Sequence, residues 1–160
     1  MIREACRDDA ARIAEIFNHY VLTSTAIFSN TCVTERQMAC KILSPEDFTP
    51  FLVNVTDGVV DGYCYAHKWS NDEVYAGTME VTIYLHHEAV GRGTGSTLLA
   101  ELIRRCRKKG VHTLVSIITD GNEASEVMHR RLGFECVGRL LGVGYKFGKY
   151  IGDAYYQLML

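Results

Sequence analysis

The sequence is poor in the features that mark several classes of protein. It has two prolines in 160 residues, Pro45 and Pro50, which fall in one segment and indicate a loop there. No run approaches the roughly 18 consecutive apolar residues that cross a membrane, and the first residues lack the basic-then-apolar pattern of a secretion signal. We therefore expect a cytoplasmic protein without a membrane partner.

The six cysteines form no recognisable metal or disulfide pattern. They lie far apart and include no C-x-x-C pair, so they lack the short spacings of metal ligands or of a small disulfide scaffold. Their positions are Cys6, Cys32, Cys40, Cys64, Cys106 and Cys136. We expect reduced cysteines that pack as ordinary side chains, and no metal site.

The charge balance excludes another class of partner. A formal net charge of −2 gives no general attraction to nucleic acid, because such binding needs clustered, unopposed Lys and Arg. The chain is 48% hydrophobic and 22% charged, which is typical of one compact domain with a full core. We therefore expect a single domain over residues 1–160, in which any bound phosphate is held locally.

Hydrophobic patterns predict a chain of alternating strands and helices. Alternation or β-rich composition predicts strands over residues 2–5, 51–56, 59–69, 78–85, 111–118, 134–141 and 154–160. Helical spacing and capping signals predict helices that begin at Asp8, at Thr34, after a glycine-rich loop at residues 90–96, and at Asn122. Asp57-Gly58 suits a tight hairpin, so the sheet is expected to be antiparallel up to residue 85. The fold class is α+β, in mixed α/β layers with helices on both faces of the sheet.

The glycine-rich loop, VGRGTGS at residues 90–96, lies between a predicted strand and a predicted helix. Backbone amides in such a turn can point together at an anion, and the helix dipole adds a favourable potential. The loop lacks the G-K-[ST] of nucleoside-triphosphate sites and differs from the G-x-G-x-x-G of dinucleotide folds. It predicts a pyrophosphate site, and a glycine-rich turn without a ligand is the alternative.

The same loop resembles the [QR]-x-x-G-x-[GA] signature of the GNAT superfamily of N-acetyltransferases, with Val90 where the signature has Gln or Arg. Four blocks resemble the phosphinothricin and methionine sulfoximine acetyltransferases: residues 18–28, 80–85, 129–134 and 144–153. The resemblance covers nearly the whole chain. It implies a central, twisted, mostly antiparallel sheet of about seven strands, acetyl-CoA as the cofactor, a small-molecule amine as the substrate, and a homodimer.

Two residues are predicted to carry the chemistry. An amine with a pKa of about 10 is mostly ammonium at pH 7, and freeing its lone pair costs roughly 4 kcal/mol, so the reaction needs a base. Glu80 lies on the polar face of its predicted strand and by resemblance matches the family's catalytic glutamate. His129 stands where many members carry a tyrosine that protonates the departing thiolate, so it is predicted to give that proton or to share the base role. The alternatives are a solvated strand carboxylate and a histidine packed on the helix flank.

The cofactor contacts are predicted from spacing and from the resemblance together. Asn122, Ser125 and His129 are three and four residues apart, so they form one stripe on the predicted helix. By resemblance, the end of the strand at 78–85 and the glycine loop complete the site. The predicted cofactor-binding residues are Ile83, Tyr84, Leu85, Gly91, Arg92, Gly93, Thr94, Gly95, Ser96, Asn122 and Ser125.

The substrate side is less defined. Candidates to wall the amine pocket, each with an ordinary core or rim position as the alternative, are Phe28, Lys68, Trp69 and Tyr75. Relatives that acetylate amino acids carry arginines before the catalytic glutamate, but residues 67–79 contain none, which leaves Lys68 as the replacement charge.

A methionine-like amino-acid analogue is the leading substrate, and another small primary amine is the second. Direct transfer in a ternary complex is expected, because no cysteine occupies a motif position. A protein or peptide acetyltransferase and a non-catalytic acyl-CoA-binding module are the competing classes.

Overall fold

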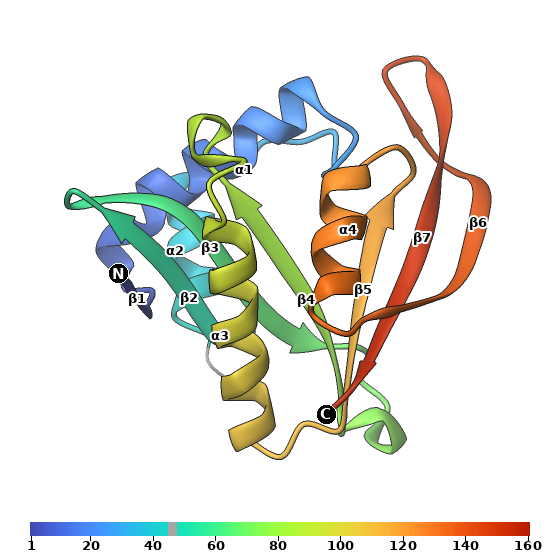
Figure 1. Cartoon of the computed structure of the whole chain (residues 1–160). Coiled ribbons are helices and arrows are strands. Elements are labelled where there is room, and N and C mark those ends of the chain that lie inside the picture. Colours follow the sequence, from blue (N-terminus) through green and yellow to red (C-terminus); the bar gives the residue numbers. More distant parts are fainter. Residues whose placement is uncertain (45–47) are drawn as a thin grey trace.

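The computed structural model describes residues 1–44 and 48–160, and within them the chain forms one seven-stranded sheet with four α-helices (Figure 1). The strands are β1 (Ile2–Glu4), β2 (Phe48–Thr56), β3 (Val59–Lys68), β4 (Thr78–Leu85), β5 (Thr113–Thr119), β6 (Glu135–Lys146) and β7 (Lys149–Met159). The helices are α1 (Ala10–Thr23), α2 (Glu35–Ile42), α3 (Thr94–Lys108) and α4 (Glu123–Arg131). The sheet order is β1-β2-β3-β4-β5-β7-β6, and every neighbouring pair is antiparallel except β4 and β5. The predicted fold class and mostly antiparallel sheet are confirmed.

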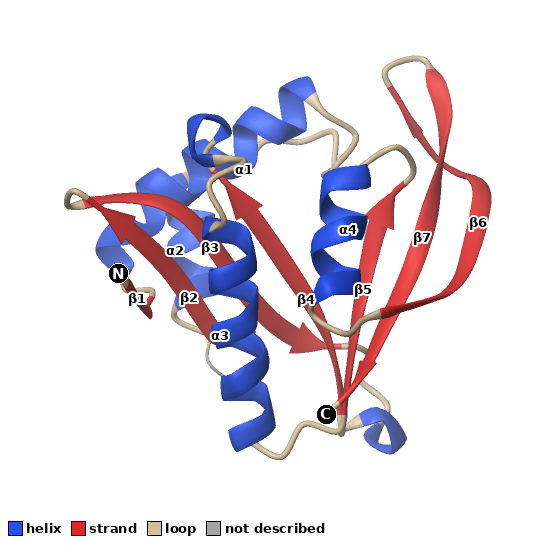
Figure 2. Ribbon diagram, in the orientation of Figure 1, coloured by secondary structure: helices blue, strands red, loops and turns tan. Residues whose placement is uncertain are grey.

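The two faces of the sheet carry separate cores, because side chains alternate along its strands. Leu52 of β2 and Cys64 of β3 belong to the buried cluster that packs against α3. Val53 and Tyr63, their immediate neighbours in the chain, belong to the cluster that packs against α1 and α2. Figure 2 shows helices on both sides of the sheet, as predicted.

The sheet parts between β4 and β5. The two parallel strands pair only from Thr78–Thr113 to Glu80–Val115, and beyond that point they diverge (Figure 1). In the described part of the chain, the backbone of β4 past Glu80 is therefore not paired with β5. Because Glu80 lies at the last pair, its side chain stands where the sheet opens.

Helix α3 follows the glycine loop and anchors it to the sheet. Gly93 is the N-cap and has a φ of +83°, a left-handed conformation that glycine adopts without strain. The apolar side of the helix is buried against the sheet through Leu98, Leu99, Leu102, Ile103 and Cys106. This packing fixes the position of the loop relative to β4.

Two local predictions are wrong. Pro50 lies within β2 rather than in a loop, at a point where the register with β3 shifts, while Pro45 lies outside the described residues. The N-cap of α1 is Asp9 rather than Asp8. The Asp9 carboxylate accepts the backbone N–H of Cys6 at 2.8 Å, which adds a short 3-10 turn before the helix.

The last two strands are longer than the sequence predicts. They meet at a turn in which Phe147 has a φ of +50° and Gly148 a φ of +75°. Most of β6 is exposed, and glycines at 138, 142 and 144 interrupt it, so neither burial nor alternation marks its full length. The fifth strand also begins later than predicted, at Thr113 rather than at residue 111.

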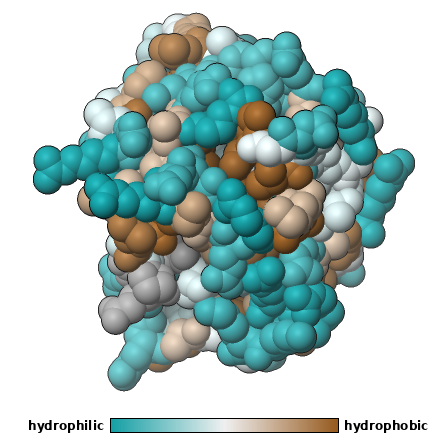
Figure 3. Space-filling model, turned by 90° about the vertical axis from the view of Figure 1, so that its left-hand side faces the viewer, coloured by the Kyte–Doolittle hydropathy of each residue, from teal (hydrophilic) through white to brown (hydrophobic). Residues whose placement is uncertain are grey.

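The surface and composition of the described residues add three facts. The face on the β1 side is mainly hydrophilic, with hydrophobic residues gathered near its centre (Figure 3). Across residues 1–44 and 48–160, none of the helices combines the length and apolar character that a membrane crossing requires, and no group of three or more His, Cys, Asp or Glu is arranged to hold a metal ion. All six cysteines are free thiols.

Candidate active site

A cleft of about 680 Å³ opens where β4 and β5 part. Its walls come from the end of β4, the glycine loop, α4 and the residues after α1. The predicted cofactor residues that line it are Ile83, Tyr84, Leu85, Gly91, Gly93, Gly95, Ser96, Asn122 and Ser125. Arg92 and Thr94 belong to the same loop and helix start but are not among the lining residues.

The glycine loop suits a diphosphate because its backbone faces open space. Gly91 and Gly93 have φ values of +78° and +83°, and a Cβ atom added at either would meet no atom within 4 Å. The first N–H groups of α3 have no intrahelical partner, so they can bind phosphate oxygens with the help of the helix dipole. Gly95 has a different role, since an added Cβ would lie 3.1 Å from the Met128 sulfur of α4. The loop can therefore hold an anion and also lets α3 pack closely on α4.

The stripe on α4 forms one connected set of polar groups. Asn122 is the N-cap, and its Oδ1 accepts the backbone N–H of Ser125 at 3.3 Å. Ser125 contacts Nδ1 of His129 through its carbonyl at 2.8 Å and its hydroxyl at 3.3 Å. The structure thus brings the three predicted residues together, and Asn122 and Ser125 line the cleft.

A second cavity, of about 90 Å³, adjoins the cleft at the point where the strands separate. The two spaces share a wall that includes Ile83 and Asn122. Phe28, Glu80 and His129, which are far apart in the sequence, meet around the smaller one. It is a suitable place for an acceptor molecule beside a ligand in the cleft.

Glu80 is the carboxylate in the wall of this acceptor cavity. Its side chain is 24% exposed, and Nε2 of His67 on the neighbouring strand lies 3.8 Å from its Oε1. Burial raises the pKa of Glu80, and the opposing effect of His67 is smaller. A carboxylate with a raised pKa is a stronger base than an exposed one. This setting fits a general base better than a solvated strand carboxylate.

His129 contributes to the cavity wall but is almost fully enclosed, with 1% exposure. Its Nδ1 donates to the Ser125 carbonyl at 2.8 Å, so Nε2 is free to accept from the Ser116 hydroxyl at 2.9 Å. Burial lowers the pKa of His129, which favours the neutral ring. These contacts favour a packed histidine that orients Ser116 and Ser125 over one that donates a proton directly to a thiolate.

Of the predicted substrate residues, the structure brings Phe28 to the acceptor cavity. Lys68 ends β3, Trp69 follows it, and Tyr75 lies in a short 3-10 turn. None of these three is among the described residues that line the two cavities, and Trp69 and Tyr75 are 36% and 46% exposed. Their contact with the amine stays a prediction.

The loop after α1 has a larger part in the site than its residue types indicate. Residues 24–26 line the cleft, and distant side chains hold them in place. The Tyr84 hydroxyl donates to the carbonyl of Ala26 at 2.9 Å. Lys146 is buried and donates to the carbonyl of Ser24 at 2.6 Å and to two further carbonyls of α1 and this loop. The resemblance of residues 18–28 to relatives is the one signal that pointed to this loop.

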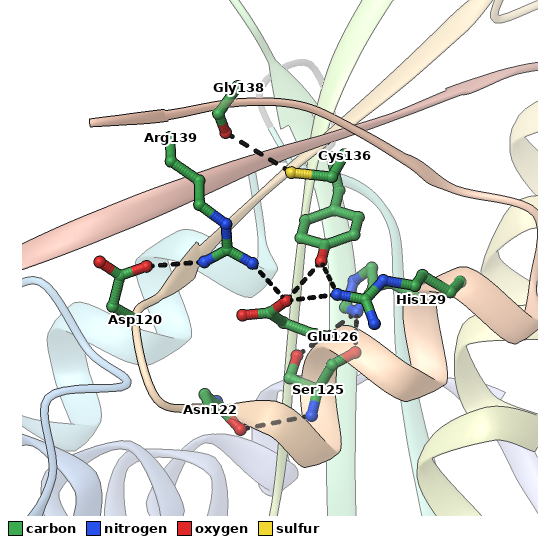
Figure 4. A network of polar contacts seen from close by, with 10 residues as sticks. Asp120, Asn122, Ser125, Glu126, His129, Cys136, Gly138 and Arg139 are labelled. Atoms are coloured by element: carbon green, nitrogen blue, oxygen red, sulfur yellow. Dashed lines mark hydrogen bonds and ion pairs between the residues drawn. The ribbon is translucent and has the colours of Figure 1, made fainter. Parts of the chain in front are cut away.

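Helix α4 is fixed to the sheet by a polar network around Glu126 (Figure 4). The buried Glu126 carboxylate accepts three hydrogen bonds, from Tyr156 (2.6 Å), Arg139 (2.6 Å) and Arg130 (2.7 Å). Arg139 also donates to Asp120, in the turn before α4, at 2.8 Å. The hydrogen bond from Tyr156, followed by the arginines, lowers the pKa of Glu126. The network fixes the helix end that lines the cleft.

The sequence of the chain matches a known protein family. The family model described as Acetyltransferase (GNAT) domain matches residues 2–154 of the chain. The chain belongs to the GNAT acetyltransferase family. The GNAT match includes the glycine loop, Glu80 and α4, so both cavities lie within the domain.

Three relatives show which part of the GNAT family the chain is similar to. It is 36% identical over 161 residues to the L-methionine sulfoximine/L-methionine sulfone acetyltransferase of Pseudomonas paraeruginosa, with 99% of this chain and 94% of that protein covered. It is 33% identical over 156 residues to the phosphinothricin N-acetyltransferase of Streptomyces viridochromogenes, with 98% and 85% covered. The crystal structure of a GNAT superfamily phosphinothricin acetyltransferase from Sinorhizobium meliloti in complex with acetyl-CoA matches with a TM-score of 0.95 and 33% identity, covering 100% of this chain and 88% of that one. The resemblance inferred from the sequence is confirmed.

Proposed function

We propose that the protein is an acetyl-CoA-dependent N-acetyltransferase that acetylates the amine of a small molecule. The expected acceptor is an amino acid or an analogue of the methionine sulfoximine or phosphinothricin type. The observation that carries the proposal is the position of Glu80, in the wall of a small cavity that adjoins the larger cleft. The cleft suits a cofactor with a diphosphate arm, and an acceptor in the small cavity would lie beside the Glu80 carboxylate. The names of the relatives support the acceptor class.

The residues of the cleft fit acetyl-CoA. The glycine loop and the first turn of α3 would bind the diphosphate, and Asn122 and Ser125 would bind the pantetheine arm. When bound, acetyl-CoA supplies an acetyl group activated as a thioester. In the described chain, the β4 backbone past Glu80 is paired with β3 but not with β5, so the N–H groups on its β5 side are available to a ligand and can stabilise negative charge that develops on a bound carbonyl oxygen.

Glu80 is the proposed base that removes a proton from the ammonium form of the acceptor. An amine is mostly ammonium at pH 7, and its lone pair is free only after a proton has left. The Glu80 carboxylate accepts that proton, directly or through a water molecule, and its raised pKa makes it a better base. Among the described residues, no cysteine lines either cavity, which supports direct transfer while both ligands are bound.

An acceptor panel tests the proposal. Thiol release from acetyl-CoA is measured with L-methionine sulfoximine, L-methionine sulfone, phosphinothricin, L-methionine and simple primary amines, and coenzyme A binding is measured by calorimetry. We expect binding together with acetylation of at least one methionine-like compound. Binding without turnover on any acceptor would indicate a non-catalytic acyl-CoA-binding module, and no binding would overturn the assignment.

A protein or peptide acetyltransferase is the other class to separate. Such an enzyme needs an open groove for an extended chain, whereas the cavity at Glu80 has a volume of about 90 Å³. The size of the cavity favours a small amine. Peptides with free N-termini and lysines, assayed beside the small amines, should therefore be poor acceptors, and a peptide that exceeds every small amine in kcat/KM would reverse this choice.

We also propose a homodimer joined through the β6-β7 hairpin. Large apolar side chains of this hairpin are exposed, including Leu141 (84%), Tyr150 (74%) and Tyr145 (60%). Contiguous exposed apolar residues are typical of an interface, and the family resemblance implies a second copy of the chain. Light scattering should give twice the monomer mass of 18.0 kDa, and Leu141→Asp should shift the protein to the monomer. A monomeric wild type would contradict this part of the proposal.

A cytoplasmic location completes the proposal. The six cysteines are free thiols, as expected in a reducing compartment. Cell fractionation should recover the protein with a cytoplasmic marker enzyme. Recovery with membranes or in the culture medium would contradict it.

A further inference from the structure

A second titratable side chain stands beside the base. His67 lies opposite Glu80 in the register of β3 and β4, so the two side chains leave the sheet on the same face. Nε2 of His67 lies 3.8 Å from Oε1 of Glu80. We propose that His67 is a proton relay for Glu80, which rests on the proposed function of Glu80 as the base. After Glu80 takes a proton from the ammonium form of the acceptor, Nε2 of His67 accepts that proton and passes it to water.

The hydrogen-bond pattern of His67 sets the direction of transfer. Its Nδ1 lies 3.1 Å from the carbonyl of Lys68, which can only accept, so Nδ1 carries the hydrogen. In the neutral ring, Nε2 therefore presents a lone pair on the side of Glu80. A closure of about 1 Å brings the pair to hydrogen-bond distance. The O–H bond of protonated Glu80 then breaks as an N–H bond forms, which regenerates the carboxylate beside an imidazolium.

The two partners face different surroundings. Glu80 lies in the wall of the acceptor cavity, while His67 is not among the described residues that line that cavity or the cleft. His67 is nevertheless 27% exposed, so it reaches solvent on another side. A ligand in the acceptor cavity would cover the part of Glu80 that lines it. His67 then offers a route by which the proton leaves without crossing the bound ligands.

Within residues 1–44 and 48–160, polar groups near His67 come from β3, α2 and β4. On β3, the ring of Tyr65 lies 5.8 Å from the ring of His67, and Lys68 follows it in the chain. Lys41 of α2 donates to the Tyr65 hydroxyl at 3.0 Å, and Glu80 is the contribution of β4. In this set, His67 is the side chain whose ring nitrogen faces the Glu80 carboxylate, so it is the suitable relay.

The test removes the imidazole ring of His67 by mutation and adds free imidazole to the assay. His67→Ala should lower kcat by about ten- to a hundred-fold, leave the KM for acetyl-CoA unchanged, and recover most of the lost kcat when imidazole is added. 1,2,4-Triazole, a ring of the same size but a much weaker base, should not restore kcat. His112→Ala is the matched control, since His112 lies just before β5, and it should keep the wild-type kcat and show no response to imidazole.

The outcomes separate a relay from a structural role. Wild-type turnover in His67→Ala overturns the relay, as does a loss that both rings restore or that neither ring restores, because these results indicate space filling or misfolding. Glu80→Gln in the same assay should lose turnover without any response to imidazole. If Glu80→Gln stays active, the base assignment fails and the relay fails with it. If Glu80→Gln is inactive while His67→Ala is normal, only the relay fails.

Discussion

The cofactor half and the acceptor half of the site are built from different materials. The cofactor half is mainly backbone, namely the glycine loop, the first turn of α3 and the free edge of β4. The acceptor half is a set of single side chains from separate segments, with Phe28 after α1, Glu80 on β4 and His129 on α4. Backbone geometry resists change, whereas a pocket of side chains can change one residue at a time. We therefore expect the cofactor to be common to the relatives and the preferred acceptor to differ.

Replacing Glu80 should have the largest effect on turnover, and this effect should not extend to cofactor binding. Glu80→Gln keeps the side-chain size but removes the basic oxygen, so kcat should fall about 10²- to 10⁴-fold, while calorimetry should show unchanged affinity for coenzyme A. In the wild type, kcat/KM should fall as the pH drops through the raised pKa of Glu80, because the protonated acid accepts no proton. An equal loss of turnover and of coenzyme A affinity would show that the two halves of the site are not independent.

Removing Lys146 should have the next largest effect, because Lys146 holds the loop from which Ala26 and Phe28 line the acceptor cavity. Its ammonium satisfies three backbone carbonyls, including those of Ser24 and Ile27, and Lys146→Met leaves them without this donor. The free energy of unfolding should fall by about 3 kcal/mol in urea titrations, and the KM for the amine should rise. Lys149→Met, at an exposed position in the same hairpin, should change neither quantity. A similar loss in both variants would show that the contacts of Lys146 with these carbonyls do not hold the loop.

A glycine exchange should weaken the cofactor half alone. Gly93→Ala forces a residue with a side chain to adopt a φ of +83°, at a cost of about 1–2 kcal/mol, and places a methyl group in the loop. The Kd for coenzyme A should therefore rise about tenfold. Gly110→Ala is the matched control, since it has a φ of +78° and open space but lies at the other end of α3. Equal Kd values in the two variants would mean that the loop does not hold the diphosphate.

The smallest predicted effect concerns the support of the cofactor half. The folded state lowers the pKa of Glu126 through Tyr156 and the arginines, so its network contributes fully above the ordinary glutamate value of 4.5. That contribution is lost as the pH falls through the lower folded value. Thermal unfolding should show a Tm that drops a few degrees more in the wild type than in Glu126→Gln between about pH 5 and about pH 3. Parallel curves for the two proteins would show that the network gives no such dependence.

The sequence predicts the fold where a short local signal sets the backbone. The Asp57-Gly58 turn has φ values of +51° and +81° and joins β2 to β3 as an antiparallel hairpin, as its residue types indicate. The length of β6 has no such signal, because its residues are mostly exposed and three glycines interrupt it before the turn at Phe147 and Gly148. The prediction of a loop at Pro50 is wrong for a related reason. The irregular register of β2 accommodates a residue that has no backbone N–H donor, and the sequence does not show this irregularity.

The same distinction explains what could be predicted of the site. The predicted cofactor residues come from one contiguous glycine loop, one strand end and one helical stripe, and most of them line the cleft, whereas the loop at residues 24–26 that also lines it carries no such pattern. The acceptor half depends on register and burial, because His67 comes beside Glu80 only through the pairing of β3 with β4. Lys146 contacts Ser24, 122 residues away in the chain, and neither residue type predicts the contact. The enclosure of His129 likewise appears only when α4 is packed on the sheet.

In the described chain, the parting of β4 and β5 leaves the β4 backbone past Glu80 open to a ligand, so binding there would also stabilise the fold. A molecule that lies along the free edge of β4 acts as a missing segment of strand, so occupancy and folding stabilise each other. At a concentration one hundred times its Kd, a single bound ligand adds about 2.7 kcal/mol to the free energy of unfolding. We therefore expect copies in a well-fed cell to resist proteases longer than copies in a starved one. The supply of acetyl groups would then set how long the enzyme lasts as well as how fast it works.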